Sequence, residues 1–194
     1  EIASGDWSSD VCSSDLKGLN PVDGTVVIAE VEHYETERHE LVLKAHIVKE
    51  IGYKDAVGMD ILMILHQLKI PTVFPESVLE EANRVSETIS PEELEGRVDL
   101  RQELTVTIDG ADAKDLDDAV ALVKREDGTF VLTVSIADVS YYVTENSEMD
   151  KEAFERGTSV YLTDRVVPML PQRLSNGICS LHPYEERLTL TARM

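Results

Sequence analysis

The stretch VTIDGADAKDLDDAV, residues 106–120, contains the densest group of carboxylates in this chain. Its carboxylates crowd together with only Lys114 to offset them, and they are Asp109, Asp112, Asp115, Asp117 and Asp118. Like charges held a few ångströms apart must take up protons, pair with a cationic side chain or bind a metal ion. Oxygen ligands at this density suit Mg²⁺ or Mn²⁺, whereas zinc prefers His or Cys, which the stretch lacks. The stretch therefore predicts a divalent-cation site.

Two other interpretations of the acidic stretch stay open from the residues alone. It is also typical of a solvated surface turn, because runs of like charge usually face water. A calcium-binding helix-loop-helix is a second alternative, but it requires Gly at the sixth position and Glu at the twelfth. Counting from Asp109, those positions hold Lys114 and Val120.

The residues on either side of the acidic stretch favour a catalytic site. Leu104–Ile108 alternates apolar and polar residues as a strand does, and Asp109 with Gly110 would end that strand. The apolar run Ala119–Val123 follows. The two runs are expected to fold the loop back against a core, and a carboxylate at the end of a rigid strand is a well-positioned ligand.

Three motifs, in this order, carry a resemblance to a known family. They are TIDGADAKDLDDAV at 107–120, VSIADVSYYV at 134–143 and RGTSVYLTDRVVPMLPQRLSNGICSL at 156–181. Together they resemble the start of the catalytic (RNB) domain of the ribonuclease II superfamily of 3′-to-5′ exoribonucleases, and most closely its bacterial ribonuclease R branch. The resemblance is specific over residues 98–194 and extends more loosely back to about residue 20.

The resemblance implies hydrolysis of single-stranded RNA from its 3′ end, processively, to nucleoside 5′-monophosphates. Asp109, Asp115, Asp117 and Asp118 match the family's four active-site aspartates, so they are expected to be catalytic and to hold Mg²⁺, with Mn²⁺ as a substitute. Asp109 and Asp118 are the expected direct ligands, Asp117 is expected to matter most for the chemical step, and Asp115 to support the metal. Asp112 lies outside the matched positions.

Tyr161 is the expected RNA-binding residue. An isolated tyrosine is usually a packing residue, and the residues alone leave that alternative open. By resemblance, however, the tyrosine of the stretch TSVYL stacks on RNA near the 3′ end. Stacking of a base on an aromatic ring is worth roughly 1–3 kcal/mol, so the role is physically reasonable.

Composition limits the possible partners. The net charge of −20 is unusual for a nucleic-acid binder, although a metal-dependent nuclease needs an acidic site and the family's basic regions are expected elsewhere. Single-stranded RNA is the expected partner, together with the ribosome or RNA-decay factors through the full-length protein. Cys12 and Cys179 offer no disulfide framework, and no apolar run reaches the roughly 18 residues of a membrane span. A cytoplasmic protein without membrane contact is expected.

Two alternatives to the nuclease hypothesis remain. One is a catalytically inactive RNA-binding relative, and the other is an acidic metal-binding interaction domain. Retention of all four matched aspartates argues against a form inactivated by loss of these residues. The family's phosphate-binding arginines, its glutamate and its S1 domain are expected beyond Met194. The chain as given is therefore expected to be a fragment with weak activity or none.

The expected fold class is mixed α+β, with a partial OB-type β-barrel, a helical linker and the N-terminal part of the RNB catalytic fold. The expected segments are 1–16, non-native or disordered; 17–54, a remnant of a cold-shock, OB-type RNA-binding domain; 55–97, a helical linker; and 98–194, a truncated RNB catalytic domain.

Local patterns predict the elements within these segments. Before the acidic stretch they predict strands at Gly24–Val31 and Glu40–Lys49 with a loop at His33–His39, helices over Asp55–Leu68 and after Pro75, and a Ser90/Glu93 capping box. After it they predict a hairpin of Ala119–Lys124 and Thr129–Ala137, with Asp138 orienting a ligand or capping the backbone. Further on they predict a helix at Asp150–Arg156, strands at Thr158–Leu162, Ile178–Leu181 and Arg187–Ala192, and a helical turn at Pro171–Ser175 closed by Asn176-Gly177.

Overall fold

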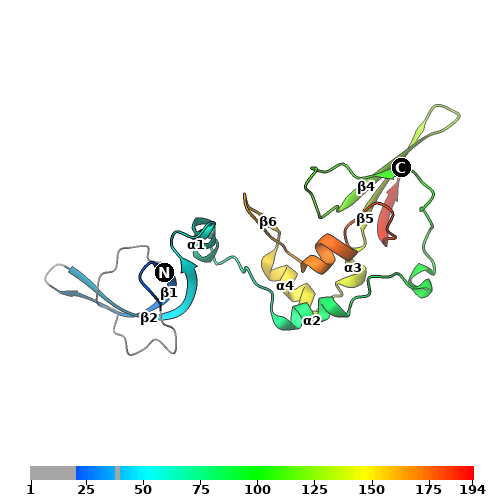
Figure 1. The fold of residues 1–194 in the computed structure, drawn as a ribbon. Helices are drawn as coiled ribbons and strands as arrows, with labels where there is room; N and C mark the ends of the chain where they lie inside the picture. Colours follow the sequence, from blue (N-terminus) through cyan, green and yellow to red (C-terminus); the bar gives the residue numbers. More distant parts are fainter. Residues whose placement is uncertain (1–20, 38–39) are drawn as a thin grey trace. The chain divides into compact units, whose positions relative to one another are not determined.

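The computed structural model describes residues 21–37 and 40–194, and the chain divides into two compact units between Thr72 and Val73 (Figure 1). Both units contain helices and strands, so the predicted mixed α+β class is confirmed. The two units are described separately below.

The first unit contains a long antiparallel hairpin followed by a helix. Its elements are β1 (Thr25–Glu37), β2 (Glu40–Tyr53) and α1 (Met59–Gln67). The loop predicted at 33–39 is wrong over residues 33–37, which belong to β1 and pair with residues 40–44. The histidine and glutamates made this stretch look polar, but Tyr34 and Thr36 are residue types that favour strands.

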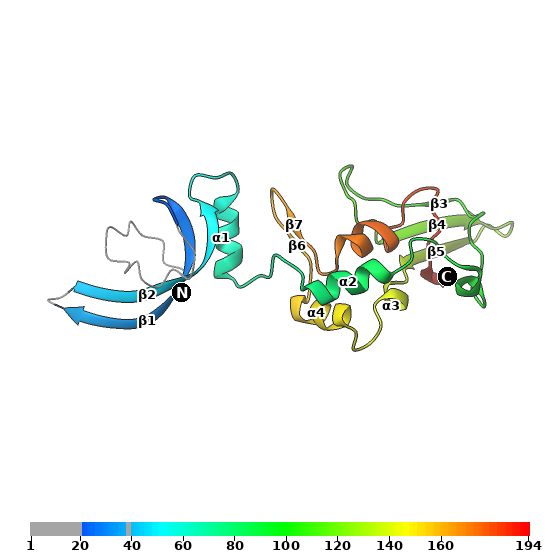
Figure 2. The same cartoon turned by 60° about the horizontal axis from the view of Figure 1, so that its bottom comes forward.

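The second unit is built on a four-stranded antiparallel sheet in the order β3-β4-β5-β8 (Figure 2). The strands are β3 (Thr105–Val106), β4 (Asp118–Lys124), β5 (Phe130–Ala137) and β8 (Thr189–Arg193). The turn between β4 and β5 places Gly128 at φ +86°, a left-handed conformation that glycine adopts without strain. The Asp127 carboxylate accepts a hydrogen bond from the Thr129 amide at 2.9 Å. The predicted hairpin is correct to within one residue.

The sheet buries its small residues and exposes its bulky ones. On β5 the buried side chains alternate along one face, and they are Val131, Thr133, Ser135 and Ala137. The opposite face carries Phe130, which is 56% exposed, and Ile136, which is 47% exposed. The face that packs against the rest of the unit is therefore the one with the smaller side chains.

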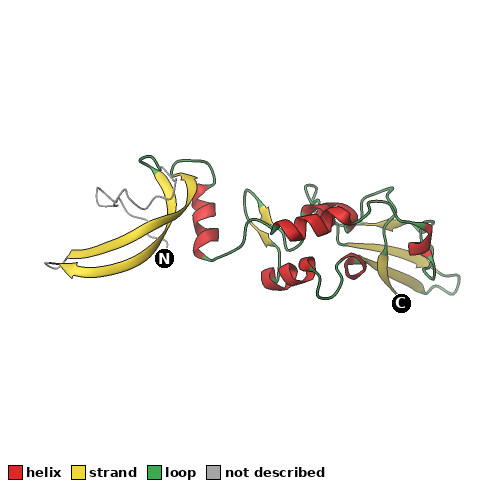
Figure 3. Ribbon diagram, turned by 90° about the horizontal axis from the view of Figure 1, so that it is seen from below, coloured by secondary structure: helices red, strands yellow, loops and turns green. Residues whose placement is uncertain are grey.

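Helices gather at one end of this sheet and form the core of the unit (Figure 3). They are α2 (Glu76–Arg84), α3 (Val139–Tyr142), α4 (Glu148–Arg156) and the π-helical turn η2 (Leu174–Ile178), while the 3₁₀ turn η1 (Pro91–Leu94) begins with the predicted capping box. The core combines residues of the helices with the last residue of β5, and its buried members are Val78, Ala82, Ala137, Met149, Leu174, Ile178 and Cys179.

Polar side chains fasten these helices together. The Glu81 carboxylate accepts a hydrogen bond from the Met149 amide at the start of α4 at 3.0 Å, so α2 satisfies one of the free amides of α4. Arg173 donates to the carbonyls of Ala82 and Val85 at the end of α2, at 3.1 and 2.8 Å. The start of α4 and the end of α2 are thus each bonded by a side chain from a neighbouring segment.

Two predictions near the C-terminal part of the chain are wrong. The helical turn does not close at Asn176-Gly177 but runs on to Ile178, and residues 178–181 do not form a strand. Leu174 and Ile178 are both buried, and the π-helical turn directs both side chains into the core. Burial here outweighs the tendency of Asn-Gly to end a helix.

Candidate active site on an aspartate loop

All of the aspartates of the acidic stretch except Asp118 lie on a loop, residues 107–117, between β3 and β4, and we call it the aspartate loop. Asp118 follows directly as the first residue of β4. The predicted strand over 104–108 is wrong beyond two residues, because the ladder with β4 includes only Thr105 and Val106. Leu104 and Ile108 are 89% and 84% exposed, so they do not fold the loop against a core. An alternating pattern suggests a strand, but the paired partner sets its length. Asp109 consequently stands in the loop, three residues after the end of β3.

The other end of the aspartate loop is firmly bonded. The Leu116 amide donates to the Ser180 hydroxyl at 2.9 Å, and that hydroxyl donates to the Lys114 carbonyl at 2.9 Å. The Leu181 amide donates to the Leu116 carbonyl at 2.8 Å, and the Ala137 amide donates to the Asp117 carbonyl at 3.1 Å. Asp118 is the first residue of β4. The loop therefore enters the sheet with its backbone held from two sides.

Among the four matched carboxylates, Asp117 is the one whose pKa is shifted by its surroundings. The pKa of the Asp117 carboxyl is raised, chiefly because the surrounding chain partly excludes water from it. The negative charges of Asp115, Asp118 and Asp109 raise the pKa of Asp117 further, in that order. Each of these effects disfavours the ionised form of Asp117. A bound cation would reverse that preference, and the all-oxygen donor set fits a hard ion such as Mg²⁺.

The carboxylates are not drawn into a closed ligand cluster. Among the side chains that the structure describes, those of residues 21–32 and 45–194, no three His, Cys, Asp or Glu are grouped so that they could hold a metal ion as they stand. The loop residues 113–117 belong to no helix or strand, and the side chains of Asp117 and Asp118 are exposed. The assignment of the four aspartates as metal ligands stays a prediction.

Tyr161 reaches the aspartate loop from a separate hairpin. It lies on β6 (Val160–Tyr161), which pairs with β7 (Val166–Val167), and its hydroxyl donates a hydrogen bond to the Asp115 carboxylate. That bond is the main reason that the pKa of Tyr161 rises to about 12. The residue remains 63% exposed. Both Tyr161 and Asp115 are predicted site residues, but nothing in the sequence indicates their contact.

Asp138 does not have the backbone-capping role that was one of the two expected for it. Its carboxylate is buried and pairs with Arg97 at 2.8 Å, and it accepts a hydrogen bond from the Ser140 hydroxyl at 3.1 Å. Asp138 precedes α3 but makes no side-chain cap there. Because an unpaired buried charge is costly, the Asp138 carboxylate pairs with the Arg97 guanidinium and not with a backbone amide of α3. No local pattern could have shown this partner, since the two residues lie 41 positions apart.

Comparison with known proteins places the chain among proteins that join a cold shock domain to an RNB domain. The cold shock domain family matches residues 10–75, and the RNB domain family matches residues 97–194. The chain belongs to the RNB family, as its motifs predicted. The OB-type and RNB parts of the expected fold class are confirmed with it.

Its relatives include several ribonucleases R. The chain is 52% identical over 178 residues to ribonuclease R 1 of Lactococcus lactis, covering 92% of this chain and 22% of that protein. It is 46% identical over 186 residues to ribonuclease R of Thermotoga maritima, covering 95% and 26%. The chain thus spans about a quarter of the length of these relatives.

A solved structure has a similar fold over nearly the whole length of this chain. RNase R of Mycoplasma genitalium in complex with double-stranded RNA aligns with a TM-score of 0.84 at 32% identity, covering 94% of this chain and 32% of that one. The same enzyme with ribose-methylated single-stranded RNA aligns with a TM-score of 0.83 at 33% identity, covering 94% and 28%.

Proposed function

We propose that the protein containing this chain is a Mg²⁺-dependent hydrolytic exoribonuclease. It degrades single-stranded RNA from the 3′ end, processively, and releases nucleoside 5′-monophosphates. The observation that carries the proposal is the group of four aspartates at positions typical of the RNB family, where three carboxylates together raise the pKa of Asp117 and an exposed tyrosine bonds to Asp115. The likeness to ribonuclease R supports the same reaction class.

The side chains of the loop have separable tasks in this proposal. Asp109, Asp115, Asp117 and Asp118 would hold one or two Mg²⁺ ions. When bound, Mg²⁺ lowers the pKa of a coordinated water and offsets negative charge on the phosphate and the leaving oxygen. Asp115 is fixed by the Tyr161 hydroxyl, and the exposed tyrosine ring offers a stacking surface to the terminal base.

Other parts of the proposal concern the whole protein. Single-stranded RNA is the proposed substrate, contacts with the ribosome or RNA-decay factors stay predictions, and so does a cytoplasmic location. In the part of the chain that the structure describes, the helices are too short or too polar for a membrane crossing. We propose that residues 1–194 alone have weak activity or none, because the chain spans only about a quarter of the length of its ribonuclease R relatives.

The proposal is tested with the natural gene product and two forms of one RNA. In Mg²⁺, a linear 5′-labelled single-stranded RNA should shorten progressively to a short limit product, with nucleoside 5′-monophosphates as the soluble product. A circular RNA of the same sequence has no 3′ end and should stay intact. Cleavage of the circle would contradict an exonuclease. Binding of linear RNA without shortening would favour the inactive RNA-binding relative, and Mg²⁺ binding without RNA binding would favour the metal-binding interaction domain.

Two variants of Tyr161 separate its hydroxyl from its ring. Tyr161→Phe loses the hydrogen bond to Asp115 but keeps the stacking surface, so we expect the affinity for RNA to stay within about threefold. Tyr161→Ala loses the surface as well, and stacking worth roughly 1–3 kcal/mol corresponds to a loss of about 5- to 150-fold in affinity. Fluorescence anisotropy with a labelled RNA in Ca²⁺ measures both. Equal weakening in the two variants would contradict a stacking role.

A further inference from the structure

Ser180 lies at the centre of the bonds that hold the aspartate loop. The residue is completely buried, at 0% exposure. Its hydroxyl accepts from the Leu116 amide and donates to the Lys114 carbonyl, both at 2.9 Å. Those two backbone groups stand immediately before and after Asp115. One hydroxyl therefore spans the peptide groups on both sides of Asp115 with its donor and one acceptor site.

The backbone next to Ser180 continues the same attachment. The Leu181 amide donates to the Leu116 carbonyl at 2.8 Å, directly before Asp117. Residues 180–181 thus make three hydrogen bonds to residues 114–116. Residues 113–117 belong to no helix or strand, so these three bonds, together with that of the Ala137 amide to the Asp117 carbonyl, hold the backbone from which Asp115 and Asp117 project.

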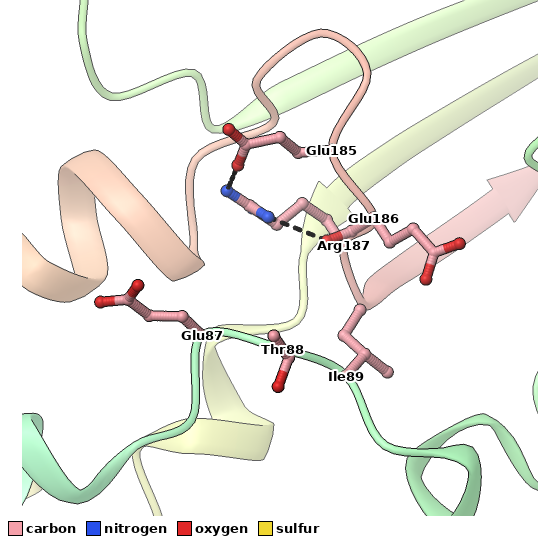
Figure 4. Close-up of a pocket in the computed structure, with 6 residues that line it drawn as sticks. All are labelled: Glu87, Thr88, Ile89, Glu185, Glu186 and Arg187. Carbon is pink, nitrogen blue, oxygen red and sulfur yellow. Dashed lines mark hydrogen bonds and ion pairs between the residues drawn. The ribbon is translucent and has the colours of Figure 1, made fainter.

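Ser180 is itself held by its surroundings. Its amide donates to the Gly177 carbonyl at 3.0 Å, which links it to the end of η2, and π-helical turns often occur at functional sites. Its carbonyl accepts from the Arg187 side chain at 2.9 Å. Figure 4 shows that side chain in a shallow pocket, bonded to the Glu185 carboxylate and to the backbone of Glu186. Ser180 is therefore bonded both to the end of η2 and to the segment that carries Arg187.

We propose that Ser180 is a positioning residue for the aspartate site. Its hydroxyl sets the orientation of Asp115 and Asp117 so that their carboxylates bind a divalent cation. This inference rests on the proposed function and names a residue that the acidic motif does not contain. The physical reason is that carboxylates of like charge repel one another, so a metal site built from them must be oriented by bonds from outside the set.

The test uses Mn²⁺ binding in the absence of RNA. Ser180→Ala in the natural gene product removes both side-chain hydrogen bonds, and loss of a group that orients metal ligands typically weakens metal affinity about 10- to 100-fold. The matched control is Ser135→Ala, because Ser135 is also a buried serine and its hydroxyl lies 3.0 Å from the Thr191 hydroxyl on β8. We expect Mn²⁺ affinity within about twofold of wild type in the control, by titration calorimetry.

Hydrogen exchange provides a second readout that a general loss of stability would not reproduce. The Leu116 amide should exchange faster in Ser180→Ala, relative to amides of β5, and should not do so in Ser135→Ala. If Ser180→Ala does not fold, Ser180→Cys under reducing conditions keeps the volume and weakens the hydrogen bonds. Ser180→Thr keeps a hydroxyl at this position. A higher Mn²⁺ affinity in Ser180→Thr than in Ser180→Ala would support the proposal further.

Several outcomes would overturn the inference. Folded Ser180→Ala with wild-type Mn²⁺ affinity would do so, and so would equal weakening in Ser135→Ala or a wild-type protein that does not bind Mn²⁺. A wild-type protein that binds Mn²⁺ but leaves RNA at full length refutes the exonuclease function only. In that case the affinity ratio between wild type and Ser180→Ala still decides the role of Ser180.

Discussion

Asp117→Asn is expected to reduce RNA shortening in Mg²⁺ by at least about 100-fold, more than is usual when only a group that orients a metal ligand is lost. Asp117 is the carboxylate on which the charges of Asp115, Asp118 and Asp109 act together, and its own environment partly excludes water. Asparagine has the shape of the aspartate side chain but lacks its negative charge, so the substitution weakens any cation site that depends on Asp117. Single-turnover digestion of a 5′-labelled RNA measures the loss.

Asp117→Asn should also leave the metal-free protein as stable as wild type, or more stable. The pKa of Asp117 is raised in the folded chain, so its ionised form costs stability at every pH above the ordinary pKa of an aspartate. Asparagine removes that cost near pH 7. Thermal unfolding in EDTA tests the direction of the change. A variant that is inactive because it is unfolded would contradict the expected combination.

The matched control for charge is Asp112→Asn. It removes one negative charge from the same loop, but Asp112 lies outside the four matched positions and is exposed. We expect its rate of RNA shortening to stay within about threefold of wild type. Equal losses in Asp112→Asn and Asp117→Asn would mean that the total charge of the loop matters and that the individual positions do not.

Leu174→Ala is expected to lower the free energy of unfolding by about 2–5 kcal/mol. Leu174 is completely buried, and it belongs to the core formed by α2, α4, η2 and the end of β5. Alanine removes the buried methyl groups and leaves a cavity that rigid helices fill only in part. Urea denaturation of the natural gene product, followed by circular dichroism, gives the change.

Leu79→Ala is the matched control for this loss. Leu79 lies on α2 next to the buried Val78 but is 42% exposed. Alanine favours helices, so the free energy of unfolding should change by less than about 1 kcal/mol. A loss in Leu174→Ala no larger than that in Leu79→Ala would show that the core does not depend on η2.

Sequence patterns correctly predicted those parts of the fold that depend on contacts between residues close together in the sequence. The hairpin at 119–137 combines strand-forming residues with an Asp-Gly turn, and the capping box at Ser90 is a contact between residues three positions apart. The errors lie where tertiary contacts decide. The ladder with β4 limits β3 to two residues, burial of Leu174 and Ile178 extends η2, and pairing with β2 extends β1 over 33–37.

The candidate site was predictable as a set of residues but not as an arrangement. The density of aspartates selected the loop, and family motifs selected Tyr161. The contacts of Ser180 with the loop, and of Arg97 with Asp138, join residues 41 to 66 positions apart. Neither periodicity nor spacing encodes such contacts, because they depend on how separate elements pack.

The attachment of the loop to Ser180 also determines when, during synthesis of the chain, the loop can become ordered. Ser180 follows Leu116 by 64 residues. At about 5–20 residues per second, a ribosome needs roughly 3–13 seconds to make that interval. During this delay the acidic loop has already been synthesised without the hydroxyl that orients it. The nascent protein therefore acquires the hydrogen bonds that hold this loop late, after much of the surrounding sheet has been synthesised.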